Sequence, residues 1–232
     1  MMIMIIVALI VYLMFWLLTD NGILSYRKIV KETEDKIKIA CVGDSITYGM
    51  MVKGWFKNAY PVKLQNMLGE AYTVTNFGMN AHTLQDSGDR PYRKAKVFKQ
   101  SRDYRPDIVV FMLGTNDCKP ENWISKQAVR NELENYLEEY TPAKIILMTP
   151  PDPLERQEKG ETVTTFNIKK VNIRTIRDLY MEVAEEKKLQ LIDLNAVMEG
   201  HDEYYASDGI HMNVLGAEEI AKQVAKAIGG QS

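Results

Sequence analysis

From residue 36 to the C-terminus, short apolar runs alternate with longer segments of helical periodicity. The apolar runs predict strands at residues 37–42, 72–76, 107–113, 144–148 and 189–192. The periodic segments predict helices at residues 59–68, 94–101, 125–140, 167–188 and 214–228. Strands that are joined through helices run in the same direction, and a parallel sheet needs cover on both faces. We therefore expect an α/β fold, a three-layer α/β/α sandwich around a parallel sheet of about five strands.

Chain length and charge narrow the class of protein further. The 232 residues suit a single domain, and 29 Lys and Arg nearly balance 31 Asp and Glu, so the net charge is −2. This balance gives no electrostatic case for a nucleic-acid partner. The two cysteines, Cys41 and Cys118, and the three histidines follow no metal-binding spacing. We expect no metal and no other cofactor, and the sequence leaves the oligomeric state open.

The first 18 residues contain no charged side chain. As a helix this stretch would be about 27 Å long, close to the hydrocarbon thickness of a bilayer. A cleaved signal peptide is the alternative, but no basic region precedes the apolar run and no small-x-small site follows it. We predict that residues 1–18 are a membrane anchor or uncleaved signal segment, residues 19–35 a polar tether, and residues 36–232 the globular domain.

The sequence leaves open on which side of the membrane the domain lies. Arg27, Lys28 and Lys31 follow the apolar stretch, and the positive-inside rule would keep the domain in the cytoplasm. The chemistry described next favours an extracytoplasmic domain.

A serine follows the first predicted strand directly, in Gly43-Asp44-Ser45. Ligands bind at the carboxyl ends of strands in open parallel sheets, so Ser45 is a candidate nucleophile. A plain turn with a helix cap is the alternative. Asp208 and His211, near the other end of the chain, supply the base that a serine hydroxyl needs and the carboxylate that orients that base.

Acyl transfer through a serine also needs donors for the negative charge that forms on the carbonyl oxygen. Gly78 follows the second predicted strand, where a glycine lets a backbone N–H approach a substrate closely. Asn116 follows the third strand and presents a side-chain amide. With the Ser45 backbone N–H, these groups form a predicted oxyanion hole, in which Asn80 is an alternative to Gly78 as a substrate contact.

These segments resemble the four blocks that mark the SGNH (GDSL-type) hydrolase family, in the family's order. The blocks are Gly43-Asp44-Ser45, Gly78, Gly114-x-Asn116-Asp117 and Asp208-x-x-His211. The resemblance implies a flavodoxin-like sheet, Ser45 as nucleophile, His211 as base and then acid, and Asp208 as its orienting partner. It also implies an oxyanion hole of Ser45, Gly78 and Asn116. Ile46 stands where the family's name-giving pattern has Leu, a small change of apolar shape.

Four segments at or near these blocks are Tyr60-Pro61-Val62, Asn76-Phe77-Gly78, residues 88–92 and residues 114–123. They resemble the carbohydrate O-acetylesterase branch of the family, including sialate O-acetylesterase-like members. On physical grounds, Arg90 offers a charged clamp, and Tyr92 and Trp123 offer stacking faces for a sugar; bracing of loops is the alternative. Residues 149–165 break the helical pattern with three prolines and form either a rim over the site or a solvated loop. The expected substrate contacts are Asp44, Asn80, Asp117, Arg90, Tyr92 and Trp123.

The resemblance and the residues together predict a serine esterase that acts on short acyl esters, acetyl above all, of a small molecule or glycan. One alternative is a lysophospholipase-like lipase or a membrane-tethered O-acyltransferase, which the apolar leader suggests. Another is a carbohydrate-binding protein without catalytic activity. The sequence does not distinguish the sugar, the acyl length, or hydrolysis from transfer.

Overall fold

The computed structural model describes residues 36–229 of the chain. The predicted anchor and tether, residues 1–18 and 19–35, lie outside the described residues. No helix within residues 36–229 combines the length and the apolar character that crossing a bilayer would take.

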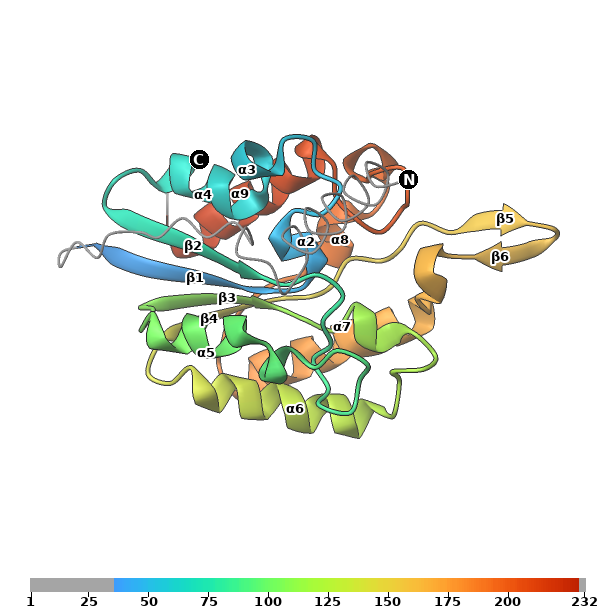
Figure 1. Cartoon of the computed structure of the whole chain (residues 1–232), viewed down its shortest axis with the longest axis horizontal. Helices are drawn as coiled ribbons and strands as arrows, with labels where there is room; N and C mark the ends of the chain where they lie inside the picture. Colours follow the sequence, from blue (N-terminus) through green and yellow to red (C-terminus); the bar gives the residue numbers. More distant parts are fainter. Residues whose placement is uncertain (1–35, 230–232) are drawn as a thin grey trace, which may run out of the picture. The chain divides into compact units, whose positions relative to one another are not determined.

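Five parallel strands form the central sheet, in the order β2-β1-β3-β4-β7 (Figure 1). Their bounds are β1 Ile37–Gly43, β2 Tyr72–Gly78, β3 Ile108–Met112, β4 Lys144–Met148 and β7 Gln190–Ile192. The predicted parallel, five-stranded sheet is confirmed, and each predicted strand is present with its ends shifted by two residues at most. The sheet begins with β1, and the later strands are added first at one edge and then at the other, which is the flavodoxin-like order.

Both faces of the sheet are buried. Successive side chains of a strand point to opposite sides, so each strand contributes to two apolar cores. Ala40 and Val42 of β1 belong to one apolar core, whereas Ile39 and Cys41 belong to the other. In β3, Val109 and Phe111 join the first core while Val110 and Met112 join the second, and the pattern continues in β4. A strand that is apolar at every position therefore fits only the middle of a three-layer fold.

Helices cover each face of the sheet (Figure 1). One face carries α5 Lys96–Asp103, α6 Lys126–Glu139 and α7 Lys170–Glu186, and the other carries α4 Tyr60–Leu68 and α9 Val214–Ile228. Ser125 caps α6 by accepting a hydrogen bond from the Ala128 N–H at 3.1 Å. The helix predicted from residue 167 begins at Lys170 instead, because Phe166 and Asn167 have φ angles of 56° and 55°, outside the helical region.

The sequence pattern missed several short elements. They are the helices α2 Ser45–Tyr48, α3 Trp55–Asn58 and α8 Leu194–Met198, and the 3-10 segments η1 Tyr92–Lys94, η2 Asn116–Cys118, η3 Thr165–Asn167 and η4 Asp202–Tyr204. One or two turns of helix are too short to show a periodicity.

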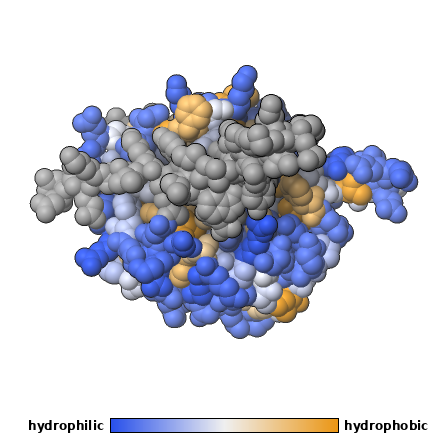
Figure 2. All heavy atoms as spheres, in the orientation of Figure 1, coloured by the Kyte–Doolittle hydropathy of each residue, from blue (hydrophilic) through white to orange (hydrophobic). Residues whose placement is uncertain are grey.

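A hairpin occupies part of the segment that was predicted as an irregular loop, residues 149–165. Strands β5 Arg156–Glu158 and β6 Glu161–Val163 pair antiparallel across Lys159 and Gly160, whose φ angles are 51° and 86°. Positive φ at both central residues is what a two-residue hairpin turn of type I′ requires. We call residues 154–168 the hairpin arm; it projects from the sheet domain and is mainly hydrophilic (Figures 1 and 2).

Candidate active site

The carboxyl ends of the first three strands lie level with one another. Gly43, the last residue of β1, is in register with Gly78 of β2 and with Met112 of β3. The segments that follow these strands therefore emerge at the same edge of the sheet. This register brings residues 44–48, 79–83 and 113–118 together, although they are far apart in sequence.

Ser45 is the first residue of α2 and is held by the turn before it. Asp44 caps this helix, since its Oδ1 accepts a hydrogen bond from the Ile46 N–H at 3.0 Å. Burial raises the pKa of the Asp44 carboxyl, against the lowering effect of the Ile46 N–H. Asp44 is completely buried, so its prediction as a substrate contact is corrected: it shapes the turn that carries Ser45.

Ser45, His211 and Asp208 form a continuous hydrogen-bonded chain. His211 Nε2 lies 2.8 Å from Ser45 Oγ, and His211 Nδ1 lies 2.6 Å from Asp208 Oδ2. An ionised carboxylate can only accept hydrogen bonds, so Nδ1 carries the proton and Nε2 accepts from the serine hydroxyl. The three side chains thus have the arrangement of a nucleophile, a base and an orienting acid.

Backbone groups hold the Asp208 carboxylate in its ionised form. Its Oδ1 accepts hydrogen bonds from the N–H groups of Ile210 and His211, both at 3.0 Å. Burial works to raise the pKa of Asp208, but the His211 side chain and these two N–H groups outweigh it and lower the pKa to about 2. The carboxylate is therefore charged at any pH at which an esterase is normally assayed.

Gly78, a predicted oxyanion donor, has another role in the structure. Its N–H donates to Asn76 Oδ1 at 2.8 Å, and Asn76 Nδ2 donates to the Thr47 carbonyl of α2 at 2.9 Å. A Cβ atom on Gly78 would lie 2.2 Å from the Tyr48 nitrogen, which is far inside van der Waals contact. The glycine is thus required for close packing of β2 against α2, and its N–H is already used.

The loop after β2 offers a different donor, which the sequence analysis missed. Ala81 has a left-handed φ of 62°, and its N–H has no acceptor within residues 36–229. Asn116 lies against the same loop, because its Nδ2 donates to the His82 carbonyl at 3.1 Å. No side-chain signal could have indicated Ala81, since only its backbone carries a polar group.

Two further predicted substrate contacts are buried in the fold and are also corrected. Asp117 is fully buried and accepts the N–H groups of Leu84 and Gln85, each at 2.8 Å. Burial raises the pKa of Asp117 to about 6 despite these N–H groups. Tyr92 is fully buried, and its hydroxyl donates to the Phe77 carbonyl at 2.6 Å. Both residues brace the loops around the site and present no surface to a sugar.

The remaining three predicted contacts are not buried. Asn80 and Trp123 are half-buried, and Arg90 is exposed. The Asn80 carbonyl lies 2.8 Å from His82 Nδ1, and Trp123 packs against the core that includes Phe111. Their contact with substrate stays a prediction. In the described part of the chain, no group of three His, Cys, Asp or Glu side chains is placed to hold a metal ion.

Comparison with protein families gives a match to the model of the GDSL-like Lipase/Acylhydrolase family over residues 41–218. An acetylxylan esterase from Xylanibacter ruminicola is 35% identical over 224 residues, which cover 87% of this chain and 45% of that protein. A multidomain esterase from Ruminococcus flavefaciens is 26% identical, over 84% of this chain and 28% of that protein. The chain thus spans less than half the length of these curated relatives.

Solved structures with the same fold support the comparison. A lipase/acylhydrolase from Enterococcus faecalis superposes with a TM-score of 0.65 and 27% identity, covering 83% of this chain and 95% of that one. A carbohydrate acetylesterase from Sinorhizobium meliloti has a TM-score of 0.64 at 18% identity, covering 84% of this chain and 99% of that one. At 18% identity the second likeness is one of fold alone.

Proposed function

The chain belongs to the GDSL-like Lipase/Acylhydrolase family, and from this membership we propose that it is a serine esterase that removes acetyl groups from carbohydrate. The observation that carries the proposal is the hydrogen-bonded chain from Ser45 through His211 to Asp208. The similarity to an acetylxylan esterase supports both the acetyl group and the carbohydrate alcohol.

In the proposed reaction, Ser45 Oγ attacks the ester carbonyl carbon while its proton passes to His211 Nε2. The imidazolium that forms is stabilised by the ionised Asp208 carboxylate at Nδ1. Nε2 then returns the proton to the leaving alcohol oxygen, and an acetyl-serine remains. A water molecule, deprotonated by the same nitrogen, releases acetate and restores the serine.

The proposed oxyanion hole consists of the Ser45 N–H, the Ala81 N–H and Asn116 Nδ2. The Ser45 N–H belongs to the first turn of α2 and has no acceptor within residues 36–229, as is normal for the start of a helix. Asn116 Nδ2 donates one of its two hydrogens to the His82 carbonyl, and the other hydrogen is available to the oxyanion. In this oxyanion hole, the Ala81 N–H takes the role that the sequence analysis gave to the Gly78 N–H.

Replacing Asn116 with alanine is expected to lower kcat for an acetyl ester about 10²-fold, with a much smaller change in KM. The lost donor acts on charge that exists only in the transition state, so ground-state binding is little affected. Steady-state kinetics with a chromogenic acetate measure both constants. Asn131→Ala, at an exposed position of α6, is the control. A fall in kcat below threefold would remove Asn116 from the oxyanion hole.

A panel of esters tests the proposed substrate class directly. Acetylated xylo-oligosaccharides, short alkyl acetates, longer acyl esters and a lysophospholipid should be compared by kcat/KM. We expect acetyl esters of the oligosaccharides to be the best substrates, with release of free acetate. Preference for the lysophospholipid, or transfer of acetyl to an added sugar in place of hydrolysis, would contradict the proposal.

We also propose that residues 1–18 anchor the enzyme in a membrane, on the ground that they carry no charged side chain. The full chain should then stay with membranes after a high-salt wash, and a variant that starts at residue 36 should not. Recovery of the full chain in the soluble fraction would contradict the anchor.

The proposed action on carbohydrate favours an extracytoplasmic domain, whereas Arg27, Lys28 and Lys31 favour the cytoplasmic side. We propose the extracytoplasmic placement. Protease added to intact cells should then degrade the domain, and full protection of the domain would place it in the cytoplasm.

A further inference from the structure

Both ends of the hairpin arm are bound to the turn that carries Asp208 and His211. At its first end, the Leu154 N–H donates to the Gly209 carbonyl at 2.8 Å. At its second end, Thr165 Oγ1 donates to the Asp208 carbonyl at 2.5 Å. Two consecutive carbonyls of the catalytic turn are therefore held by the two ends of one hairpin.

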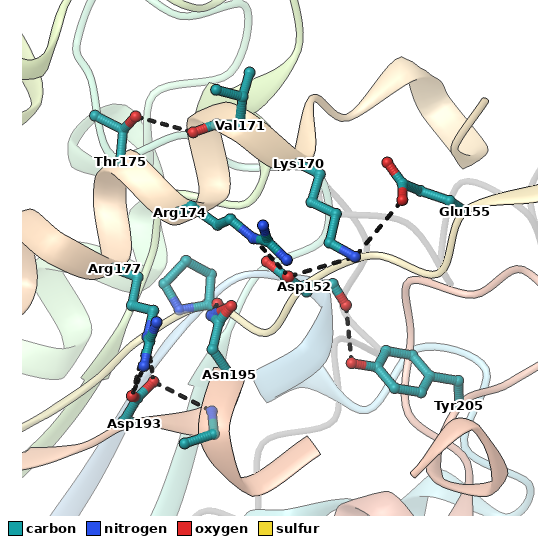
Figure 3. Close-up of polar contacts among 12 residues, drawn as sticks. Asp152, Glu155, Lys170, Val171, Arg174, Thr175, Arg177, Asp193, Asn195 and Tyr205 are labelled. Carbon is teal, nitrogen blue, oxygen red and sulfur yellow. Dashed lines mark hydrogen bonds and ion pairs between the residues drawn. The ribbon is translucent and has the colours of Figure 1, made fainter. Parts of the chain in front are cut away.

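Ion pairs fix the base of the arm to α7 (Figure 3). Asp152, just before the arm, accepts from Arg174 Nε at 3.1 Å and lies 3.6 Å from Lys170 Nζ. Lys170 Nζ also lies 3.7 Å from Glu155 at the start of the arm. The Tyr205 hydroxyl donates to the Asp152 carbonyl at 2.8 Å and ties the same segment to the chain before Asp208. The arm thus starts from a base that is anchored on two sides.

Phe166, near the second end of the arm, lies beside the catalytic imidazole. The centroids of the Phe166 and His211 rings are 6.3 Å apart, with an interplanar angle of 73°. Even so, residue Phe166 is 59% exposed, and its φ of 56° is rare for an aromatic residue. A large apolar ring is therefore kept in water next to the reacting groups, in a backbone conformation that costs free energy.

The chemistry of the reaction indicates which part of a substrate meets this ring. His211 Nε2 must reach the leaving oxygen to protonate it, so the alcohol of the ester lies on the histidine side of the reacting carbon. Phe166 presents an exposed aromatic surface beside that imidazole. The C–H face of a pyranose is apolar and matches the flat face of an aromatic ring.

Resting on the proposed esterase function, we infer that Phe166 and the hairpin arm form the binding site for the sugar that carries the acetyl group. The pyranose stacks on Phe166 while its acetylated oxygen is within reach of His211 Nε2. Neighbouring sugars of the chain then extend along the polar side chains of β5 and β6.

The charge of the arm fits an uncharged glycan. The arm carries two basic side chains, Arg156 and Lys159, and three acidic ones, Glu155, Glu158 and Glu161, and all five residues are exposed. A surface that binds anionic membranes would combine apolar side chains with an excess of basic ones. The hairpin is mainly hydrophilic (Figure 2) and has no excess of basic side chains, so it favours the sugar over a lipid surface.

The test compares one substrate with a large alcohol and one with an alcohol too small to reach Phe166. Acetylated xylo-oligosaccharide and 2-hydroxyethyl acetate serve this purpose, with acetate release as the readout. For Phe166→Ala we expect kcat/KM on the oligosaccharide to fall about tenfold, equal to about 1.4 kcal/mol, mainly through a higher KM. On 2-hydroxyethyl acetate we expect less than a twofold change. Phe166→Trp should retain oligosaccharide activity, and Phe56→Ala, at an exposed site on α3, should leave both substrates unaffected.

Equal losses on both substrates would mean that Phe166 only positions His211, and no loss on either would mean that no sugar touches it. Either result overturns the inference. Selective loss of lysophospholipid cleavage in Phe166→Ala would also overturn it, because a lipid would then occupy this surface. A wild-type enzyme that cleaves 2-hydroxyethyl acetate but no acetylated oligosaccharide contradicts the proposed substrate class itself, which separates the two failures.

Discussion

Ser45→Ala is expected to lower kcat for a chromogenic acetyl ester by at least about 10⁴-fold. Without Oγ there is no atom to form the acyl-enzyme, and His211 Nε2 loses the group it deprotonates. The fold should survive, because Ser45 contributes one hydrogen bond through its side chain and Asp44 still caps α2. Steady-state rates and a thermal unfolding curve measure the two effects separately.

Ser207→Ala is the matched control for this substitution, since Ser207 is exposed and precedes Asp208 directly. It should keep wild-type rates. A serine-directed phosphonate should label Ser45 in the wild-type enzyme, as seen by mass spectrometry of the labelled peptide. An active Ser45→Ala enzyme, or labelling at another serine, would refute the assignment of the nucleophile.

Asp208→Asn should lower kcat about 10³- to 10⁴-fold with little change in structure. The N–H groups of Ile210 and His211 need an acceptor, so they hold the amide oxygen of the new side chain at the Oδ1 position. Its NH₂ group then faces His211 Nδ1, where the carboxylate oxygen stood at 2.6 Å. Nδ1 must accept this hydrogen bond, which moves the imidazole proton to Nε2 and leaves no lone pair for the Ser45 hydroxyl.

The imidazole tautomer can be followed independently of activity. Nitrogen NMR of labelled histidine should show the proton on Nδ1 of His211 in the wild-type enzyme and on Nε2 in Asp208→Asn. Asp202→Asn, an exposed change in η4, is the control and should alter neither the tautomer nor the rate. Retention of more than about a tenth of wild-type kcat in Asp208→Asn would show that the carboxylate is not needed to orient the base, since such a loss is below about 1.4 kcal/mol.

The sheet could be predicted because its strands are fully buried. A strand such as β3, which is apolar at all five positions, has no polar face to offer water, so it must lie between two layers of helices. The apolar stripes of α6 and α7 could be recognised in the sequence for the same reason, because burial of one face makes apolar residues recur at helical spacing in a long helix. The hairpin arm was missed because its strands are exposed and carry no apolar alternation.

The juxtaposition of Ser45, His211 and Asp208 could be predicted from side-chain chemistry, because few residue types can supply a nucleophile, a base and an orienting acid. Asp44, Asp117 and Tyr92 were wrongly expected to contact substrate, because the same polar groups can serve buried loops. Residue type does not reveal burial, and burial decided these three cases. Whether Arg90, Asn80 and Trp123 contact the substrate stays a prediction.

The amino-acid pattern alone therefore determined the parallel layered fold and pointed to the three side chains that the structure brings into one hydrogen-bonded chain, because hydrophobic periodicity and chemical function are properties of local residues. The three-dimensional structure decided which backbone N–H groups are available: that of Gly78 is used by Asn76, and that of Ala81 is open among the described residues. It also decided that the ring of Phe166, which is 45 residues before His211 in the chain, lies 6.3 Å from the His211 ring, measured between centroids. Such contacts depend on strand register and on where an exposed hairpin folds back, and neither is encoded in any short stretch of sequence.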